Sequence, residues 1–165
     1  MNPAGRDGAD DLPLHGDLDL ALRLFVTLVL AIAVGCEREW HGHPAGIRTM
    51  ALVGVGACLF TGMGMETIFG ARVDPTRIAA QIVTGVGFLG AGTILRSGGE
   101  VHGMTTAATI WVVAALGMAV GFGFYGIGIF TAALVLVTLV AIRPLEHRFF
   151  KRHKARAETE ESAPT

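Results

Sequence analysis

The sequence predicts an all-α fold, a membrane bundle of about five transmembrane helices, from three observations. Hydrophobic residues make up 52% of the 165-residue chain and charged residues only 16%, whereas a typical soluble domain is roughly 25% charged. The charges gather near the two ends, with five aspartates among residues 1–19 and a basic run after residue 142. Between them lie apolar stretches long enough to cross a bilayer.

The first three apolar stretches, residues 20–36, 50–68 and 78–95, each predict one spanning helix, because about 17–25 residues cross the hydrocarbon. The fourth stretch, residues 106–142, is too long for a single crossing. It contains the sequence GFGFYG at residues 121–126, whose glycines interrupt a helix and whose aromatic rings suit the membrane interface. We therefore expect two further helices, at residues 106–120 and 124–142.

The helices form one transmembrane domain at residues 20–142, between an acidic segment at residues 1–19 and a tail at residues 143–165. The tail is first basic and then acidic, which is typical of a disordered segment. The acidic start is unlike a signal peptide, so the first helix is expected to remain. Since cytoplasmic segments are enriched in Lys and Arg, the basic tail places the C-terminus in the cytoplasm and the N-terminus outside. No compact basic domain exists that would bind nucleic acid.

Ionisable side chains within a bilayer usually face the protein interior or water, and the predicted topology gathers the polar residues at two levels. The cytoplasmic polar cluster lies at the ends of the predicted helices and comprises Glu37, Arg38, Glu39, Arg48, Thr49, Arg96, Thr105 and Thr106. The outer polar cluster comprises Glu66, Arg77 and Gln81.

Two interpretations of the cytoplasmic polar cluster stay open. In the first, each residue anchors a helix end at the interface, and Thr105 or Thr106 is the N-cap of the fourth helix. In the second, the cluster lines an inward-facing vestibule in which Glu37 pairs with Arg48 or Arg96. For the outer polar cluster, a structural ion pair between Glu66 and Arg77 is the favoured interpretation, and Gln81 shares a helix face with Arg77.

No cofactor, metal site or catalytic site is predicted. Glu37 and Glu39 are turned roughly 200° apart on a helix, so they do not bind one ion together. A transition-metal site at His41 and His43 is a minor alternative. The motifs G-x-S-x-G, H-E-x-x-H and G-x-x-x-x-G-K-[ST] do not occur in the sequence, and we expect no enzymatic activity.

Residues 85–92 read GVGFLGAG and match the G-x-G-x-x-G spacing of a dinucleotide-binding turn. Such a turn needs a preceding strand and an acidic residue about 20 positions later, but these glycines lie inside an apolar span. We therefore interpret them as the packing centre of the bundle, where a bulky residue such as leucine at position 87 would disrupt assembly. The predicted packing residues are Gly85, Gly87, Gly90 and Gly92.

Small residues spaced four apart also predict close helix contacts. These contacts form either inside the bundle or with another membrane protein. The four pairs are Ala31/Gly35, Gly87/Ala91, Gly117/Gly121 and Gly128/Ala132.

Three ordered sequence blocks resemble the MgtC/SapB family of bacterial membrane proteins. The first joins GCERE at residues 35–39 to AGIRT at residues 45–49, and the second is RIAAQIVTGVGFLGAG at residues 77–92. The third is VHGMTTAATIW at residues 101–111. Together they make a specific resemblance that covers roughly residues 20–140.

The resemblance implies a bacterial inner-membrane protein with about five spanning helices. The best-known branch of the family is linked to growth in low magnesium and to survival inside macrophages. Members of that branch are thought to modulate other membrane proteins, including the proton-driven ATP synthase, rather than to carry magnesium. That branch has a soluble C-terminal domain after its helices, whereas a short basic tail follows here, so the chain resembles the short members.

Two functions are consistent with these observations. The first is a non-enzymatic regulator that binds helices of a partner complex or of its own copies. The second is an oligomeric transporter or channel for an ion or small solute, with Arg77 and Gln81 lining one vestibule and the Glu37 group the other. We favour the regulator, because the sequence offers no convincing set of ion ligands.

Overall fold

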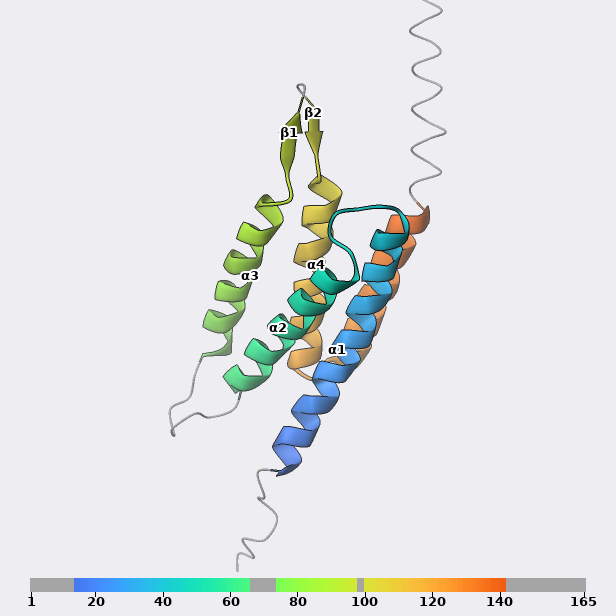
Figure 1. Cartoon of the computed structure of the whole chain (residues 1–165). Coiled ribbons are helices and arrows are strands. Elements are labelled where there is room, and N and C mark those ends of the chain that lie inside the picture. Colours follow the sequence, from blue (N-terminus) through green and yellow to red (C-terminus); the bar gives the residue numbers. More distant parts are fainter. Residues whose placement is uncertain (1–13, 66–73, 98–99, 142–165) are drawn as a thin grey trace, which may run out of the picture.

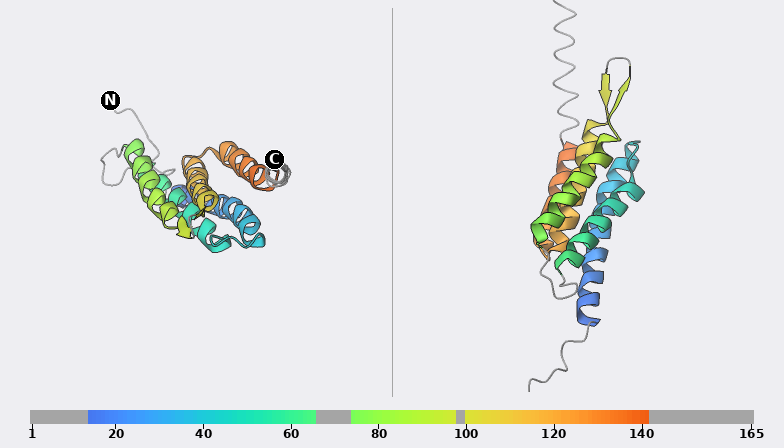
Figure 2. Two further views of the ribbon diagram at one scale, coloured as in Figure 1. Left: turned by 90° about the horizontal axis from the view of Figure 1, so that it is seen from above. Right: turned by 90° about the vertical axis from the view of Figure 1, so that its left-hand side faces the viewer.

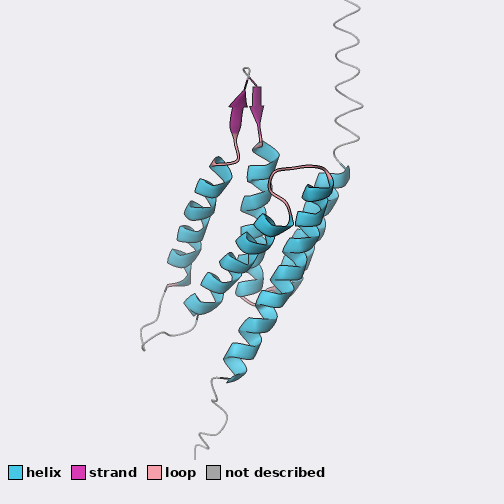
Figure 3. Cartoon of the chain, viewed as in Figure 1, coloured by secondary structure: helices cyan, strands magenta, loops and turns pink. Residues whose placement is uncertain are grey.

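The computed structural model describes residues 14–65, 74–97 and 100–141, which form five helices and one short hairpin (Figure 1, Figure 3). The first three helices are α1 (Leu14–Trp40), α2 (Ile47–Met65) and α3 (Pro75–Ala91). The strands β1 (Leu95–Ser97) and β2 (Glu100–His102) lead into α4 (Met104–Gly121). A fifth helix, Tyr125–Ala141, completes the bundle. The predicted all-α class and the five helices are confirmed, while Glu66 and residues 143–165 lie outside the described residues.

The helices differ in length and in how well they match a bilayer. Gly16–Trp40, Ile47–Met65 and Met104–Gly121 are long and apolar enough to cross a membrane, and Tyr125–Ala141 is apolar but shorter. At 1.5 Å per residue, the 27 residues of α1 extend about 40 Å and the 17 residues of α3 about 26 Å. Successive helices run in opposite directions, so α1 begins at one end of the bundle and the fifth helix finishes at the other (Figure 1).

The central helix of the bundle is α4. It contacts α1, α2 and α3, and half of its residues are buried, as expected for a helix that is apolar on all sides. The fifth helix packs against the same core through Val135, Leu136 and Leu139. Viewed along the bundle, α3 and the fifth helix lie on opposite sides of α4 (Figure 2), so both are peripheral.

The closest helix contact joins α2 and α4. A Cβ atom at Gly117 would collide with the carbonyl oxygen of Gly54, and one at Gly121 would lie 2.8 Å from the carbonyl oxygen of Cys58. A Cβ atom at Gly54 would in turn lie 3.1 Å from that of Ala31 on α1. Glycine thus brings the α2 and α4 backbones into contact where α1 also packs.

The glycines of α3 do not form the packing centre that the sequence predicts. Positions 85 and 87 have no atom within 4 Å of an added Cβ, and Gly92 meets only backbone oxygens of the last turn of α3. Of these four glycines, Gly90 alone packs on a neighbouring helix, since a Cβ atom added there would lie 3.4 Å from the carbonyl oxygen of Ala107. The periodicity of small residues marks a helix face but does not tell which neighbour covers it.

Of the four predicted small-residue pairs, three are buried inside the bundle and one is not. Ala31/Gly35, Gly117/Gly121 and Gly128/Ala132 are buried, whereas Gly87 and Ala91 are exposed on α3.

The hairpin between α3 and α4 is absent from the sequence prediction, which continues the third helix to residue 95. The helix ends at Ala91, where the Thr93 hydroxyl donates a 2.8 Å hydrogen bond to the carbonyl oxygen of Gly90. The strands pair antiparallel, with Leu95 opposite His102 and Ser97 opposite Glu100. Gly103 then turns the chain into α4 with a φ of 89°, a value that glycine adopts without strain.

We expect Gly117→Leu to prevent stable folding, because its side chain would have to displace the backbone of Gly54. Overpacking of this kind costs about 1–3 kcal/mol or more. Gly87→Leu is the matched control and should fold normally, since the space beside Gly87 is open. Thermal unfolding of both variants in detergent measures the difference, and equal midpoints would contradict the assigned packing centre.

Candidate functional site

The last turn of α1 carries Glu37, Arg38 and Glu39 at the end of the bundle from which the hairpin projects, called the hairpin end below. The helix includes all three residues, whereas the sequence prediction ends it at residue 36. Gly42 ends it instead, with a φ of 70° and with its N–H bonded to the carbonyl oxygen of Glu39. Because consecutive helical residues are turned by 100°, the three side chains face three different partners.

Arg38 ties α1 to α4. Its side chain is buried with 2% exposed, and Nη2 donates a 2.9 Å hydrogen bond to the hydroxyl oxygen of Thr106. Thr106 is itself 2% exposed, so this charge-assisted bond lies inside the protein. Thr105 or Thr106 was expected as the N-cap of α4, but both lie within the helix and Gly103 is the N-cap.

Glu39 ties α1 to the start of α2. Its Oε2 accepts a 2.9 Å hydrogen bond from the backbone N–H of Ile47, the first residue of α2. The first N–H groups of a helix have no partner within it, and a side-chain oxygen from α1 supplies one here. Gly35 and Gly46 permit this approach, since a Cβ atom at Gly35 would lie 2.6 Å from Cα of Ile47.

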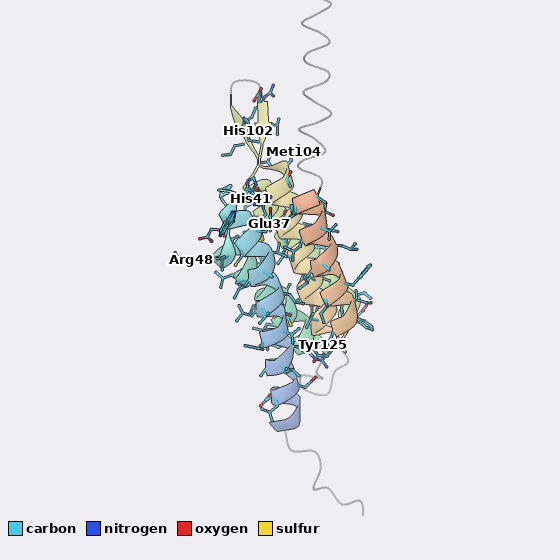
Figure 4. All side chains as sticks on the ribbon, turned by 90° about the vertical axis from the view of Figure 1, so that its right-hand side faces the viewer. Glu37, His41, Arg48, His102, Met104 and Tyr125 are labelled. Atoms are coloured by element: carbon cyan, nitrogen blue, oxygen red, sulfur yellow. The ribbon has the colours of Figure 1, made fainter. Side chains whose placement is uncertain are left out.

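Glu37 pairs with neither of the predicted arginines. Its side chain is 7% exposed, and Oε1 lies 2.9 Å from Nδ1 of His41, one helical turn further along. Arg48 and Arg96 are exposed, and none of the ion pairs in the described parts of the chain joins either of them to Glu37. Figure 4 shows Glu37, His41 and Arg48 at the same end of the bundle. The extended α1 places His41 beside Glu37, which corrects the predicted pairing.

The cytoplasmic polar cluster therefore divides into two groups. Glu37, Arg38, Glu39 and Thr106 are buried or bonded between elements, whereas Arg48, Arg96 and Thr105 are exposed and Thr49 is half-buried. Over residues 14–65, 74–97 and 100–141, no three His, Cys, Asp or Glu side chains gather as metal ligands would.

A further polar cluster, formed by Asp19, Arg23 and Tyr125, lies at the opposite end of the bundle. The sequence interpretation missed it. Nη1 of Arg23 donates a 2.6 Å hydrogen bond to the carbonyl oxygen of Gly121, and Nη2 lies 2.5 Å from Oδ2 of Asp19. The hydroxyl of Tyr125 donates a 3.3 Å hydrogen bond to Oδ1 of Asp19. The i,i+4 spacing of Asp19 and Arg23 was the available sequence signal.

This cluster joins three helices. Arg23 binds the carbonyl end of α4, where the helix dipole is negative, and Asp19 contacts the first residue of the fifth helix. Figure 4 places Tyr125 at the end of the bundle away from Glu37 and His41. Arg23 and Asp19 therefore join helices at this end of the bundle, as Arg38 and Glu39 join helices at the hairpin end.

Arg77 and Gln81 of the outer polar cluster are exposed on α3, and Glu66, their predicted companion, lies outside the described residues. Both side chains line a groove of about 1190 Å³ between α2 and α3. Asp74 lines the same groove and is the N-cap of α3, accepting a 2.9 Å hydrogen bond from the N–H of Thr76. Hydrogen bonds from Thr76 hold the pKa of the Asp74 carboxyl below its usual value.

Comparison with known proteins decides the family. The MgtC family model matches residues 24–148 of the 165. The chain belongs to the MgtC family. No solved structure matches it.

Curated relatives agree with the family assignment. YhiD of Escherichia coli K12, named as a candidate magnesium transporter, is 40% identical over 141 residues, which are 82% of this chain and 66% of YhiD. Protein MgtC of Salmonella typhimurium LT2 is 40% identical over 127 residues, 77% of this chain and 54% of that protein. Protein slr0014 of Synechocystis is 45% identical over 124 residues, covering 75% and 52%. The chain thus spans between half and two thirds of the length of these relatives.

The sequence blocks that resemble the MgtC/SapB family meet at the hairpin end. Arg38 of the GCERE block bonds to Thr106 of the GMTTAA block, and Glu39 bonds to Ile47 of the AGIRT block. In this MgtC-family chain Arg38 therefore joins two helices that are far apart in the sequence, and Glu39 joins two consecutive helices.

Thr106→Val should destabilise the protein by about 1–3 kcal/mol, because it leaves the buried Arg38 guanidinium without its hydroxyl acceptor. Thr105→Val makes the same chemical change at the neighbouring exposed position and should have little effect. Equilibrium unfolding in detergent compares the two variants. A double-mutant cycle of Thr106→Val with Arg38→Gln that shows no coupling energy would contradict a stabilising hydrogen bond between Arg38 and Thr106.

Arg23→Gln should loosen the junction between α4 and the fifth helix, because the Gly121 carbonyl oxygen and the Asp19 carboxylate both lose their cationic partner. We expect amide hydrogen exchange in residues 121–128 to accelerate about tenfold or more, as the loss of a charged hydrogen bond implies. Tyr125→Phe removes only the 3.3 Å contact and should change exchange far less. Unchanged exchange in Arg23→Gln would contradict the proposal that this cluster holds the junction between α4 and the fifth helix.

Proposed function

We propose that the chain is a non-enzymatic regulator of other membrane proteins, acting in magnesium limitation, acid or intracellular stress. In this proposal it lies in the bacterial inner membrane with its N-terminus outside and its C-terminus in the cytoplasm. It acts by placing one helix, α3, against a helix of a partner, which is another membrane protein such as the ATP synthase or a second copy of the chain.

The observation that carries the proposal is the exposed small-residue face of α3. Ala80, Thr84, Gly87 and Ala91 follow one another at intervals of three or four residues and are all exposed, so they share one side of the helix. Gly90, on another side, packs on α4. Within residues 14–65, 74–97 and 100–141 no helix or strand covers the exposed side, since α3 packs mainly on α2 and α4 and lies at the edge of the bundle (Figure 2).

Small residues suit such a face to helix pairing in lipid. Apolar surface alone does not drive two helices together in a bilayer, because lipid tails are equally apolar. Close backbone approach supplies van der Waals contact instead, and Gly87, with no atom within 4 Å of its Cβ position, gives a second helix room to approach. Phe88 is 81% exposed at the margin of this face and offers an adjacent aromatic contact.

The polar contacts also favour a regulator over a pathway for ions. Arg38, Glu39 and Arg23 each bond to another helix or to its end. These contacts hold the bundle together, whereas a vestibule for ions needs charged groups directed toward water.

An oligomeric transporter of an ion or small solute is the second candidate. Two observations favour it. The E. coli relative YhiD is named as a candidate magnesium transporter, and Arg77 and Gln81 line a groove. Magnesium flux into liposomes by the purified protein, abolished by Gln81→Ala or Glu37→Gln, would establish this alternative.

Site-specific photocrosslinking tests the regulator. A photoreactive residue at position 84, on the exposed face, should capture one membrane protein reproducibly in cells. Gly87→Leu should reduce that capture about tenfold or more, the loss expected when side chains block close helix packing. Gly85→Leu adds the same side chain on a different side of α3, also in open space, and should leave capture unchanged. Magnesium flux in liposomes without any captured partner would overturn the proposal.

A further inference from the structure

The groove between α2 and α3 has a volume of about 1190 Å³ and apolar walls along most of its length. Phe60 on α2 and Leu89 on α3 are exposed to it, at 62% and 53%. Gly56 and Gly85 line its two walls, and neither has an atom within 4 Å of its Cβ position. This space is larger than the roughly 300–1,000 Å³ of most small-molecule pockets.

The polar residues that line the groove are Asp74, Arg77 and Gln81, all near the start of α3. This part of α3 lies at the end of the bundle opposite the hairpin, close to the end of α2 (Figure 1), and α2 is long and apolar enough to cross a membrane. The remaining lining residues are apolar and continue along the helices toward the hairpin end. The groove therefore changes from charged to apolar in the direction from the membrane surface to the hydrocarbon.

The charged end of the groove carries both signs. Asp74 is an N-cap whose Oδ1 accepts hydrogen bonds from the N–H and the hydroxyl of Thr76, and these bonds lower the pKa of the carboxyl. The Arg77 guanidinium makes no hydrogen bond or ion pair with any of the described residues. Gln81 is one turn further along and shares the groove side of α3.

We propose that this groove binds one phospholipid with a zwitterionic headgroup. Arg77 and Gln81 bind its phosphate, Asp74 binds its ammonium group, and its acyl chains lie between α2 and α3 over Gly56 and Gly85. A phosphate accepts charge-assisted hydrogen bonds from a guanidinium, and an ammonium group bonds to a carboxylate. This site lies on a different side of α3 from the partner-binding face and does not depend on it.

The order of polarity along the groove favours a lipid over a helix as the occupant. A phospholipid places charges of both signs at the membrane surface and apolar chains directly beneath them, in the same order as the groove. A transmembrane helix packed along the apolar part of the groove would leave the Arg77 guanidinium without a hydrogen-bond or ion-pair partner among the described residues. The chemistry of the charged end therefore selects the lipid.

Native mass spectrometry of the purified protein, titrated with phosphatidylethanolamine or phosphatidylglycerol in detergent, tests the proposal. We expect one bound phospholipid per chain and a preference of about tenfold for phosphatidylethanolamine, since a charged hydrogen bond contributes about that factor. Asp74→Asn should abolish the preference while retaining the helix cap, because asparagine caps as well as aspartate. Arg77→Gln should weaken the binding of both lipids.

Three glycine variants separate the groove from its surroundings. Gly85→Leu and Gly56→Leu fill the groove from its two walls and should each remove the bound lipid. Gly87→Leu, on the exposed face of the same helix, should keep it. Thermal unfolding confirms that each variant is folded, and one folded groove variant is sufficient for the test.

Retention of lipid by the groove variants that fold, even if only one does, or an equal affinity of the native protein for the two headgroups, would overturn the proposal. Capture of a second copy or of another protein by a crosslinker at position 85 would assign the groove to a helix instead. These outcomes do not bear on the partner-binding face, since that face is tested with a crosslinker at position 84 and with Gly87→Leu.

Discussion

The contact between the backbones of α2 and α4 is the constraint on which the rest of the structure depends. Gly117 lies against the carbonyl group of Gly54, and Gly121 lies beside Cys58. In lipid, close packing and polar bonds hold helices together. Once these two helices touch, α1 fits over Gly54 through Ala31. Arg38 and Arg23 then reach α4 near its start and at its end, respectively.

Much of the fold follows from the sequence because hydrophobic length and helix-breaking residues are local signals. Four apolar stretches predict five helices, because GFGFYG correctly divides the fourth stretch in two, with Gly123 adopting a φ of 88°. The hairpin was not predicted because its strands have only three residues each, too few for a recognisable alternation. The end of α1 was misplaced because a charged stretch after an apolar one resembles a helix exit.

The candidate site was predicted in part. The sequence places Arg38 and Thr106 at one level, but it does not show that they bond, since that depends on the rotation of two helices. One of the two interpretations left open paired Glu37 with Arg48 or Arg96, whereas its Oε1 lies 2.9 Å from Nδ1 of His41, one turn away. Arg23 belongs to neither of the two polar clusters predicted from the sequence. The glycine-rich stretch of α3 was placed at the centre because spacing alone does not distinguish an interior face from an outward one, and in this chain Gly87 faces outward.

The short length of α3 has a consequence for the surrounding bilayer. A hydrocarbon core is about 30 Å thick, and the 17 residues of α3 extend only about 26 Å. Lipids beside α3 must therefore shorten or tilt to meet it, at a cost of fractions of a kcal/mol for each ångström. Membrane thickness thus acts on the side of the protein where the exposed Gly85 and Gly87 lie.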